Sequence, residues 1–400
     1  MSEANRTESS AERAVRVKGY GSSSFRSKED VRKSYRSADG LSVEPVVVTS
    51  LAEYIDEISS LHDDTITVDN PMFYHGHTNI DYILLPTVMR GVMSAEKQLF
   101  DEFRRRFPNE LKDCRQTVEK LAFMQHYGLY TRCLDLSENP LIGLHFAVSD
   151  MVKFRTEVDK NRNNWGEVVL IHLQKDDTDD IKYFDSPTVS VISNVAQLGE
   201  DFCLQQVQLL FIKDRQQTSL DNFIYFRDIL RRSVIVRTKQ DNPRIINQRG
   251  AFILVNANEI TDIFDGGIYG RRNAVGAEEF TSYIYGNSDE VRELNLWGLQ
   301  HGQCDRYRTE FKNTEEWDFK FRKVKPYSLE NKSRVMQNDP FDLKRMLFRN
   351  RNGSQKVILI PPDAKTRIKR ELQMIGITEE FVYPEIDSVS YALNGLFFRS

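Results

Sequence analysis

The order of apolar and polar positions along the chain predicts helices and strands that are mixed without a regular alternation. Apolar residues recur at helical spacing after Ser50, Ser94 and Thr117, so each of these residues is predicted to begin a helix. Continuous apolar runs at 167–173 and 251–255 predict strands buried inside a sheet. Because no βαβ repeat is visible, we expect an α+β fold: a single large mixed domain whose central, mostly buried sheet is flanked by helices.

Local signals at element ends refine these predictions. Ser50 and Glu53 have the spacing of a capping box, and Asn139-Pro140 puts a capping side chain before a proline at the first helical position. Gly128 is predicted to end the preceding helix, and His145 is expected in the core because it lies on an apolar helix face. Further predicted elements are strands at 46–48, 72–74, 131–135, 356–360 and 381–383, a helix from Pro243 to Gly250, and a helix at 362–375.

Two segments differ from the remainder of the chain in composition. Residues 1–40 contain nine serines, nine Lys or Arg and six Asp or Glu, with almost no apolar periodicity, so we predict a flexible tail. The domain is predicted to span 41–394. Within it, residues 262–330 are rich in Gly, Asn, Tyr and charge, and we interpret them as an insertion that serves as a lid, a partner surface or a decorated loop.

The overall charge and the cysteines limit the classes of function. The formal net charge is −4, which is not typical of a protein whose main work is holding nucleic acid, although a local basic patch would still allow it. The four cysteines are far apart and form no C-x-x-C, which argues against a disulfide framework or a zinc site. There is no long apolar run and no signal peptide, so we expect a cytoplasmic protein without a membrane partner.

Polar residues gather at the ends of three predicted elements within residues 71–150. The clusters are Phe73-Tyr74-His75-Gly76-His77-Thr78, Met124-Gln125-His126-Tyr127-Gly128 and Thr131-Arg132-Cys133-Leu134-Asp135-Leu136-Ser137. A helix end, a tight turn and a strand start separate Gln125 from Arg132, so their side chains should lie near one another. In the strand, Arg132 and Leu134 should point to one face, and Thr131, Cys133 and Asp135 to the other.

These motifs resemble the FRG domain, a family of bacterial and phage proteins. The family's Met-Gln-His-Tyr-Gly helix end is present at 124–128, its Thr-Arg-Leu-Leu-Asp strand appears as Thr-Arg-Cys-Leu-Asp at 131–135, and its Asn-Pro-Leu begins at Asn139. The likeness extends over roughly residues 71–394, with 262–330 unaccounted for. The Arg of the eponymous Phe-Arg-Gly motif is His75 here, and a histidine can be neutral and can accept a hydrogen bond, whereas an arginine cannot.

The resemblance and the local spacing together give a set of candidate site residues. The predicted catalytic residues are His75, Gln125, Arg132 and Asp135, and the predicted ligand-binding residues are Tyr74, Gly76, Thr78, His126, Thr131 and Gln248. For each of them a purely structural role is the alternative; Arg132 and Asp135, for example, could form a buried ion pair. No metal site is predicted, because His75, His77 and His126 lack a carboxylate or cysteine at local spacing.

Whether the protein is an enzyme stays open at this stage, and the first hypothesis is NAD-dependent ADP-ribosyl transfer. Tyr74-His75-Gly76 followed by Thr78 resembles the His-Gly-Thr strand end of one ADP-ribosyltransferase class, which would make the fold ADP-ribosyltransferase-like and NAD the cofactor. That chemistry needs a carboxylate or an amide on the ribose, for which Glu259, Gln248 and Asp135 are candidates.

Two other functions are also compatible with these residues. The first is a non-catalytic binding or sensing module of the toxin or phage-defence type that FRG domains imply. It would recognise a nucleotide, a nucleic-acid end or a protein target inside the cell. The second is a metal-dependent nuclease, for which Asp135 and Glu138 form the only local carboxylate pair.

Overall fold

The structure of the protein is a computed structural model. It describes residues 17–18, 36–37, 43–61, 66–80, 84–90, 95–149, 164–216, 229–230, 232–256, 258–265, 317–323 and 343–385. Within these ranges, no helix is both long enough and apolar enough to cross a membrane. Most of the predicted tail lies outside the described residues, which include from it only the short antiparallel pair β1 (Val17–Lys18) and β2 (Arg36–Ser37).

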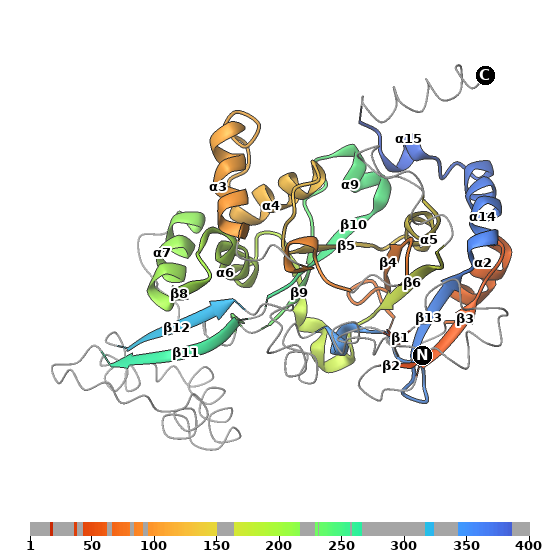
Figure 1. Cartoon of the computed structure of the whole chain (residues 1–400), viewed down its shortest axis with the longest axis horizontal. Coiled ribbons are helices and arrows are strands. Elements are labelled where there is room, and N and C mark those ends of the chain that lie inside the picture. The colour runs from red at the N-terminus through yellow and green to blue at the C-terminus, as the bar shows by residue number, and fades with distance from the viewer. Residues whose placement is uncertain are drawn as a thin grey trace, which may run out of the picture.

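An eight-stranded mixed sheet forms the centre of the fold, with the strand order β3-β13-β6-β4-β5-β10-β9-β7 (Figure 1). Neighbouring strands run antiparallel except for the pairs β13–β3 and β7–β9, which are parallel. The strands are β3 (Val43–Val47), β4 (Phe73–His77), β5 (Cys133–Ser137), β6 (Gly166–Ile171), β7 (Ile181–Tyr183), β9 (Val234–Arg237), β10 (Gly250–Leu254) and β13 (Gln355–Ile360). The predicted central sheet is therefore confirmed.

Two groups of helices cover the two halves of this sheet, and Figure 1 shows them on opposite sides of the molecule. Apolar side chains of α2, α5 and α14 pack with β4, β6 and β13, while those of α3, α4 and α6 pack with β5, β9 and β10. The helices are α2 (Leu51–Ser59), α3 (Glu96–Arg106), α4 (Thr117–His126), α5 (Pro140–Val148), α6 (Pro187–Asn194), α7 (Leu204–Arg215), α9 (Pro243–Gln248), α14 (Pro362–Met374) and α15 (Glu379–Val382). A third apolar cluster contains side chains from both halves and joins them.

Several helix ends form as their sequences predict. The Ser50 hydroxyl accepts from the Glu53 N–H at 3.2 Å, and the Asn139 side chain accepts from the Leu141 N–H at 3.0 Å. Both bonds satisfy backbone donors that have no partner inside the helix. Gly128 has φ of 81°, a conformation that costs glycine little, and it turns the chain from α4 toward β5.

Other predictions are wrong in detail, and tertiary contacts give the reason. The residues predicted as a strand at 381–383 form the end of the one-turn helix α15 and the residue after it, because Thr378 caps the Phe381 N–H. Helix α9 ends at Gln248, before the predicted Gly250, and Arg249 after it adopts the left-handed conformation. Gly250 instead begins β10, which pairs with β5 on one side and β9 on the other.

A second sheet extends from this core. Its three strands are β8 (Asp201–Cys203), β11 (Asn258–Asp265) and β12 (Trp317–Lys323), and β12 lies between the other two. Figure 1 shows β11 and β12 as a long antiparallel ribbon that points away from the eight-stranded sheet. This ribbon forms part of the predicted insertion 262–330; the rest of the insertion lies outside the described residues.

Candidate functional site

Strands β4 and β5 are paired at a single position, where Tyr74 lies opposite Ser137. Beyond this pair, the side chain of His75 bridges the two strands. The Nδ1 atom of His75 lies 2.7 Å from the main-chain oxygen of Asp135. A carbonyl can only accept, so Nδ1 carries the proton and donates it. In the neutral ring Nε2 then holds the lone pair and can act as an acceptor. A histidine therefore stands at the junction of the two halves of the sheet, at the position of the FRG arginine.

The carboxylate of Asp135 is exposed beside this histidine and is positioned by Gln125. The Gln125 amide nitrogen donates to Asp135 Oδ1 at 3.1 Å and to the Cys133 carbonyl at 3.3 Å. The Gln125 oxygen accepts a hydrogen bond from the Thr131 hydroxyl. Since the amide bonds to β5 at two points and to Thr131 just before it, it fixes the end of α4 against the start of β5. Four predicted site residues thus come together: His75, Gln125, Thr131 and Asp135, which we call the β4–β5 corner.

Arg132 lies away from this corner, in a buried group of charges. Its guanidinium is fully buried and donates to both carboxylate oxygens of Glu96, at 2.8 and 2.6 Å. Lys323 of β12 donates to the same carboxylate at 2.7 Å. Burial alone raises the pKa of Glu96, but the attraction of Arg132 and Lys323 outweighs it and lowers that pKa to about 2. Arg132 therefore anchors the start of β5 to α3 and to the β11–β12 ribbon.

The expected alternation of side chains along β5 is confirmed. Leu134 packs in the apolar cluster that joins the two halves of the sheet, whereas Cys133 packs with α4 and α6. Burial raises the pKa of the Cys133 thiol. The Asp135 side chain shares the face of Cys133, which places it on the side of the sheet where α4 lies.

The remaining predicted residues of β4 are placed among structural elements. Tyr74 is buried against α2 and α5, and burial raises its pKa to about 12. Gly76 allows helix α5 to approach closely, because a Cβ atom at this position would overlap the Gly143 carbonyl. The Thr78 carbonyl accepts from the buried ammonium of Lys365 at 2.6 Å.

His126 and Gln248 contact a segment that sequence reasoning did not assign to the site, residues 379–385, here called the C-terminal segment. His126 Nε2 lies 3.0 Å from Glu385 Oε1, and the Gln248 amide donates to the Val382 carbonyl at 2.9 Å. Arg244 also bonds Glu385, at 3.2 Å, and lies over the Tyr383 ring at 4.7 Å. Figure 1 shows α15, the helix of this segment, between α9 and α14.

Tyr383 packs the C-terminal segment against α5, with its ring centroid 6.3 Å from that of His145 and 6.4 Å from that of Phe146. Its ring is buried, and burial raises the pKa of its phenol, although the positive charge of Arg244 acts in the opposite direction. Two signals marked this region in the sequence, the Gln-x-Gly after Arg244 and the Pro-Glu-Ile-Asp that begins at Pro384. Neither signal, however, indicates which residues they contact.

Two further histidines are buried near the corner. His77, also on β4, forms a short hydrogen bond with the buried carboxylate of Glu167, and its ring lies 5.5 Å from that of His75. His145 is buried as predicted, 3.8 Å from Glu379, and burial lowers its pKa. Neither arrangement gathers ligands for a metal: within the described ranges, no group of three His, Cys, Asp or Glu side chains could hold an ion.

The carboxylates considered for a nuclease have different partners. Asp135 is held by Gln125, whereas Glu138 lies 3.4 Å from the Nε atom of Arg237. Glu259, another candidate for the ribose, lies on β11, but its side chain is outside the described part of the structure.

The corner thus belongs to a mixed α/β domain in which polar motifs converge from a strand end, a helix end and a strand start. Residues 70–156 match the family model of the FRG domain, so this chain carries an FRG domain. The matched residues contain all of the polar clusters from which the resemblance was inferred. No curated protein and no solved structure matches the chain.

Proposed function

We propose that the β4–β5 corner binds a nucleotide, and that NAD is its ligand and the donor in an ADP-ribosyl transfer. One observation carries this proposal. The pairing of β4 with β5 ends after one residue pair, and His75 and the exposed carboxylate of Asp135 lie where the two strands separate. Carboxylates accept hydrogen bonds from ribose hydroxyls in many nucleotide sites. The sheet strands on both sides would hold such groups rigidly, as catalysis requires.

In this proposal Asp135 is the residue that contacts the reacting ribose. Its carboxylate accepts from the 2′-hydroxyl of the nicotinamide ribose and stabilises the positive charge that develops at C1′. The C1′–N bond breaks, nicotinamide leaves with the electron pair, and an acceptor hydroxyl or amine bonds to C1′ and loses its proton to water. Gln125 and His75 are positioning residues, because they hold the Asp135 side chain and main chain, respectively.

A second candidate is a binding module without chemistry. His75 and Gln125 both form hydrogen bonds with β5 itself. Such bonds indicate residues that maintain the shape of a binding site rather than residues that react. The resemblance to toxin and phage-defence proteins is compatible with either candidate.

For either candidate we expect that expression of the chain in a bacterial host slows growth, and that a variant without the Asp135 carboxylate no longer slows it.

The test is incubation of the full chain with NAD, with and without cell lysate, and measurement of free nicotinamide. We expect Asp135→Asn, which keeps an acceptor oxygen for Gln125, to lower release by about 100-fold or more. Glu138→Gln is the matched control, because Glu138 lies three positions away and pairs with Arg237. If calorimetry shows that NAD binds but no nicotinamide is released, the second candidate, a binding module without chemistry, is supported. If NAD neither binds nor releases nicotinamide, the proposal is refuted.

A further inference from the structure

Four aromatic rings form a continuous ladder along the surface of α3 and α4. The ring centroids of Phe107 and Phe103 are 4.7 Å apart, those of Phe103 and Phe123 6.4 Å, and those of Phe123 and Tyr127 4.8 Å. The two end rings are well exposed, Phe107 at 41% and Tyr127 at 63%. The Tyr127 ring also contacts that of His126, at 5.0 Å, so the ladder leads from the end of α3 toward the C-terminal segment, where His126 meets Glu385.

Three consecutive arginines, Arg104, Arg105 and Arg106, flank the exposed end of this ladder. Their side chains are 42%, 67% and 65% exposed. Arg105 and Arg106 share one carboxylate, that of Glu102, at 2.8 and 3.2 Å. Exposed pairs of this kind contribute little, so the guanidinium groups can exchange them for another anion at small cost. Residues 97–107 contain four basic and two acidic side chains, although the whole chain is acidic.

We propose that the α3–α4 aromatic ladder binds single-stranded nucleic acid. Bases stack on exposed aromatic rings, and arginines beside the rings hold the phosphates; this combination is how proteins bind single strands without reading their sequence. The exposed end rings, Phe107 and Tyr127, offer the stacking faces, whereas Phe103 and Phe123 are partly buried against the core and support them at 4.7 and 4.8 Å. This inference does not depend on NAD consumption at the corner.

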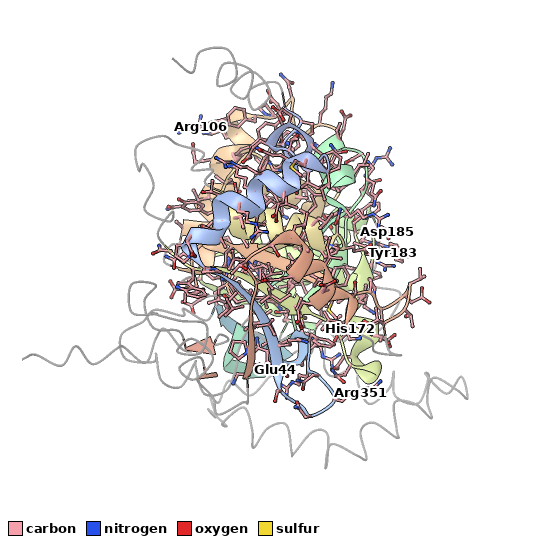
Figure 2. All side chains as sticks on the ribbon, turned by 90° about the vertical axis from the view of Figure 1, so that its right-hand side faces the viewer. Glu44, Arg106, His172, Tyr183, Asp185 and Arg351 are labelled. Carbon is pink, nitrogen blue, oxygen red and sulfur yellow. The ribbon has the colours of Figure 1, made fainter. Side chains whose placement is uncertain are left out.

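The test is the fluorescence anisotropy of labelled oligonucleotides of about 15 bases, oligo(dT) and oligo(U), with the full chain and without NAD. We expect Phe107→Ala and Tyr127→Ala each to weaken binding about tenfold. Tyr183→Ala is the matched control. Tyr183, on β7, is 62% exposed and its ring lies under the guanidinium of Arg237, so its replacement should leave oligonucleotide binding unchanged. Figure 2 shows Arg106, near the ladder, far from Tyr183.

A charge test separates phosphate contacts from stacking. The double variant Arg105→Ala and Arg106→Ala should weaken binding and reduce the dependence of log K on log salt by about 2. Arg351→Ala is its control, since Arg351 is exposed in a turn on the opposite side of the molecule (Figure 2). The proposal is overturned if the wild type binds neither oligonucleotide at low salt, if Tyr127→Ala and Tyr183→Ala behave alike, or if duplex binds as tightly as single strand. It is equally overturned if the ladder binds a protein in a pull-down while the oligonucleotides do not bind.

Discussion

The buried charges at the start of β5 give the sharpest prediction for stability. Glu96→Gln keeps the shape of the side chain but removes the negative charge that pairs with Arg132 and Lys323. All three side chains are almost completely buried, so neither cation can recover its hydration. We therefore expect Glu96→Gln to destabilise the fold strongly.

Two independent routes give the size of this effect. Breaking a buried ion pair by removing one partner typically costs about 3–5 kcal/mol. The interactions that hold the pKa of Glu96 at about 2 instead of 4.5 correspond to roughly 3 kcal/mol at neutral pH. Lys323→Met should cost less, about 1–3 kcal/mol, because the Arg132–Glu96 pair survives and only the bonds of the ammonium to Glu96 and to the Leu198 carbonyl are lost.

Urea unfolding followed by tryptophan fluorescence measures both variants. At pH 7 we expect the urea concentration at the midpoint of unfolding to be lower for Glu96→Gln than for the wild type by about 1 M or more. The midpoint of Lys323→Met should lie between those of the wild type and Glu96→Gln. The Glu96 pKa is lowered by folding, so its contribution is present above about pH 4.5 and disappears as the pH falls toward 2. The difference between wild type and Glu96→Gln should therefore narrow over that range. A Glu96→Gln variant as stable as Lys323→Met at pH 7 would refute the reasoning.

Three further results are expected. Gly76→Ala should unfold or precipitate the protein, because the added methyl group would overlap the Gly143 carbonyl. Solubility and thermal melting measure this effect, and a normal melting temperature would contradict the close approach of α5 to β4. Folding lowers the pKa of His145, so its contribution to stability is present above its ordinary pKa of 6.5 and decreases in more acidic solution. His145→Gln should therefore flatten the wild-type loss of stability as the pH falls below about 6.5. Arg244→Met should release the C-terminal segment and speed chymotrypsin cleavage after Phe381, which Val382 follows, about tenfold, and an unchanged rate would show that the other contacts suffice.

Elements whose signals are local were predicted well. The helices after Ser50, Gln116 and Asn139 begin at or beside the predicted residues, because their caps lie within three or four positions along the chain. The buried strands β6, β10 and β13 were found from continuous apolar runs. Helices α6 and α7 were missed; the buried side chains of α6 divide between the cluster with β5, β9 and β10 and a cluster shared with α7, so they form no single apolar stripe in the sequence.

The candidate site was predicted in part. Gln125 was expected near Arg132, because a helix end, a tight turn and a strand start leave the chain little freedom. The structure instead brings Gln125 to Thr131 and Asp135, on the other face of the strand. The sequence could not show that Arg132, from the same strand, is paired with Glu96 and Lys323, which are 36 and 191 positions away. Nor could it show that His126 and Gln248 hold the C-terminal segment.

The sequence by itself therefore determined the kinds of element, their approximate ends and the polar motif at 124–137, since capping, turn chemistry and apolar spacing act over a few residues. Only the tertiary structure decided which charged side chains are buried and which remain at the surface. The guanidinium at position 132 is buried because a carboxylate from α3 and an ammonium from β12 surround it. Asp135, three residues later in the same strand, remains exposed beside His75, because the neighbouring strand β4 has already diverged from β5 at this level.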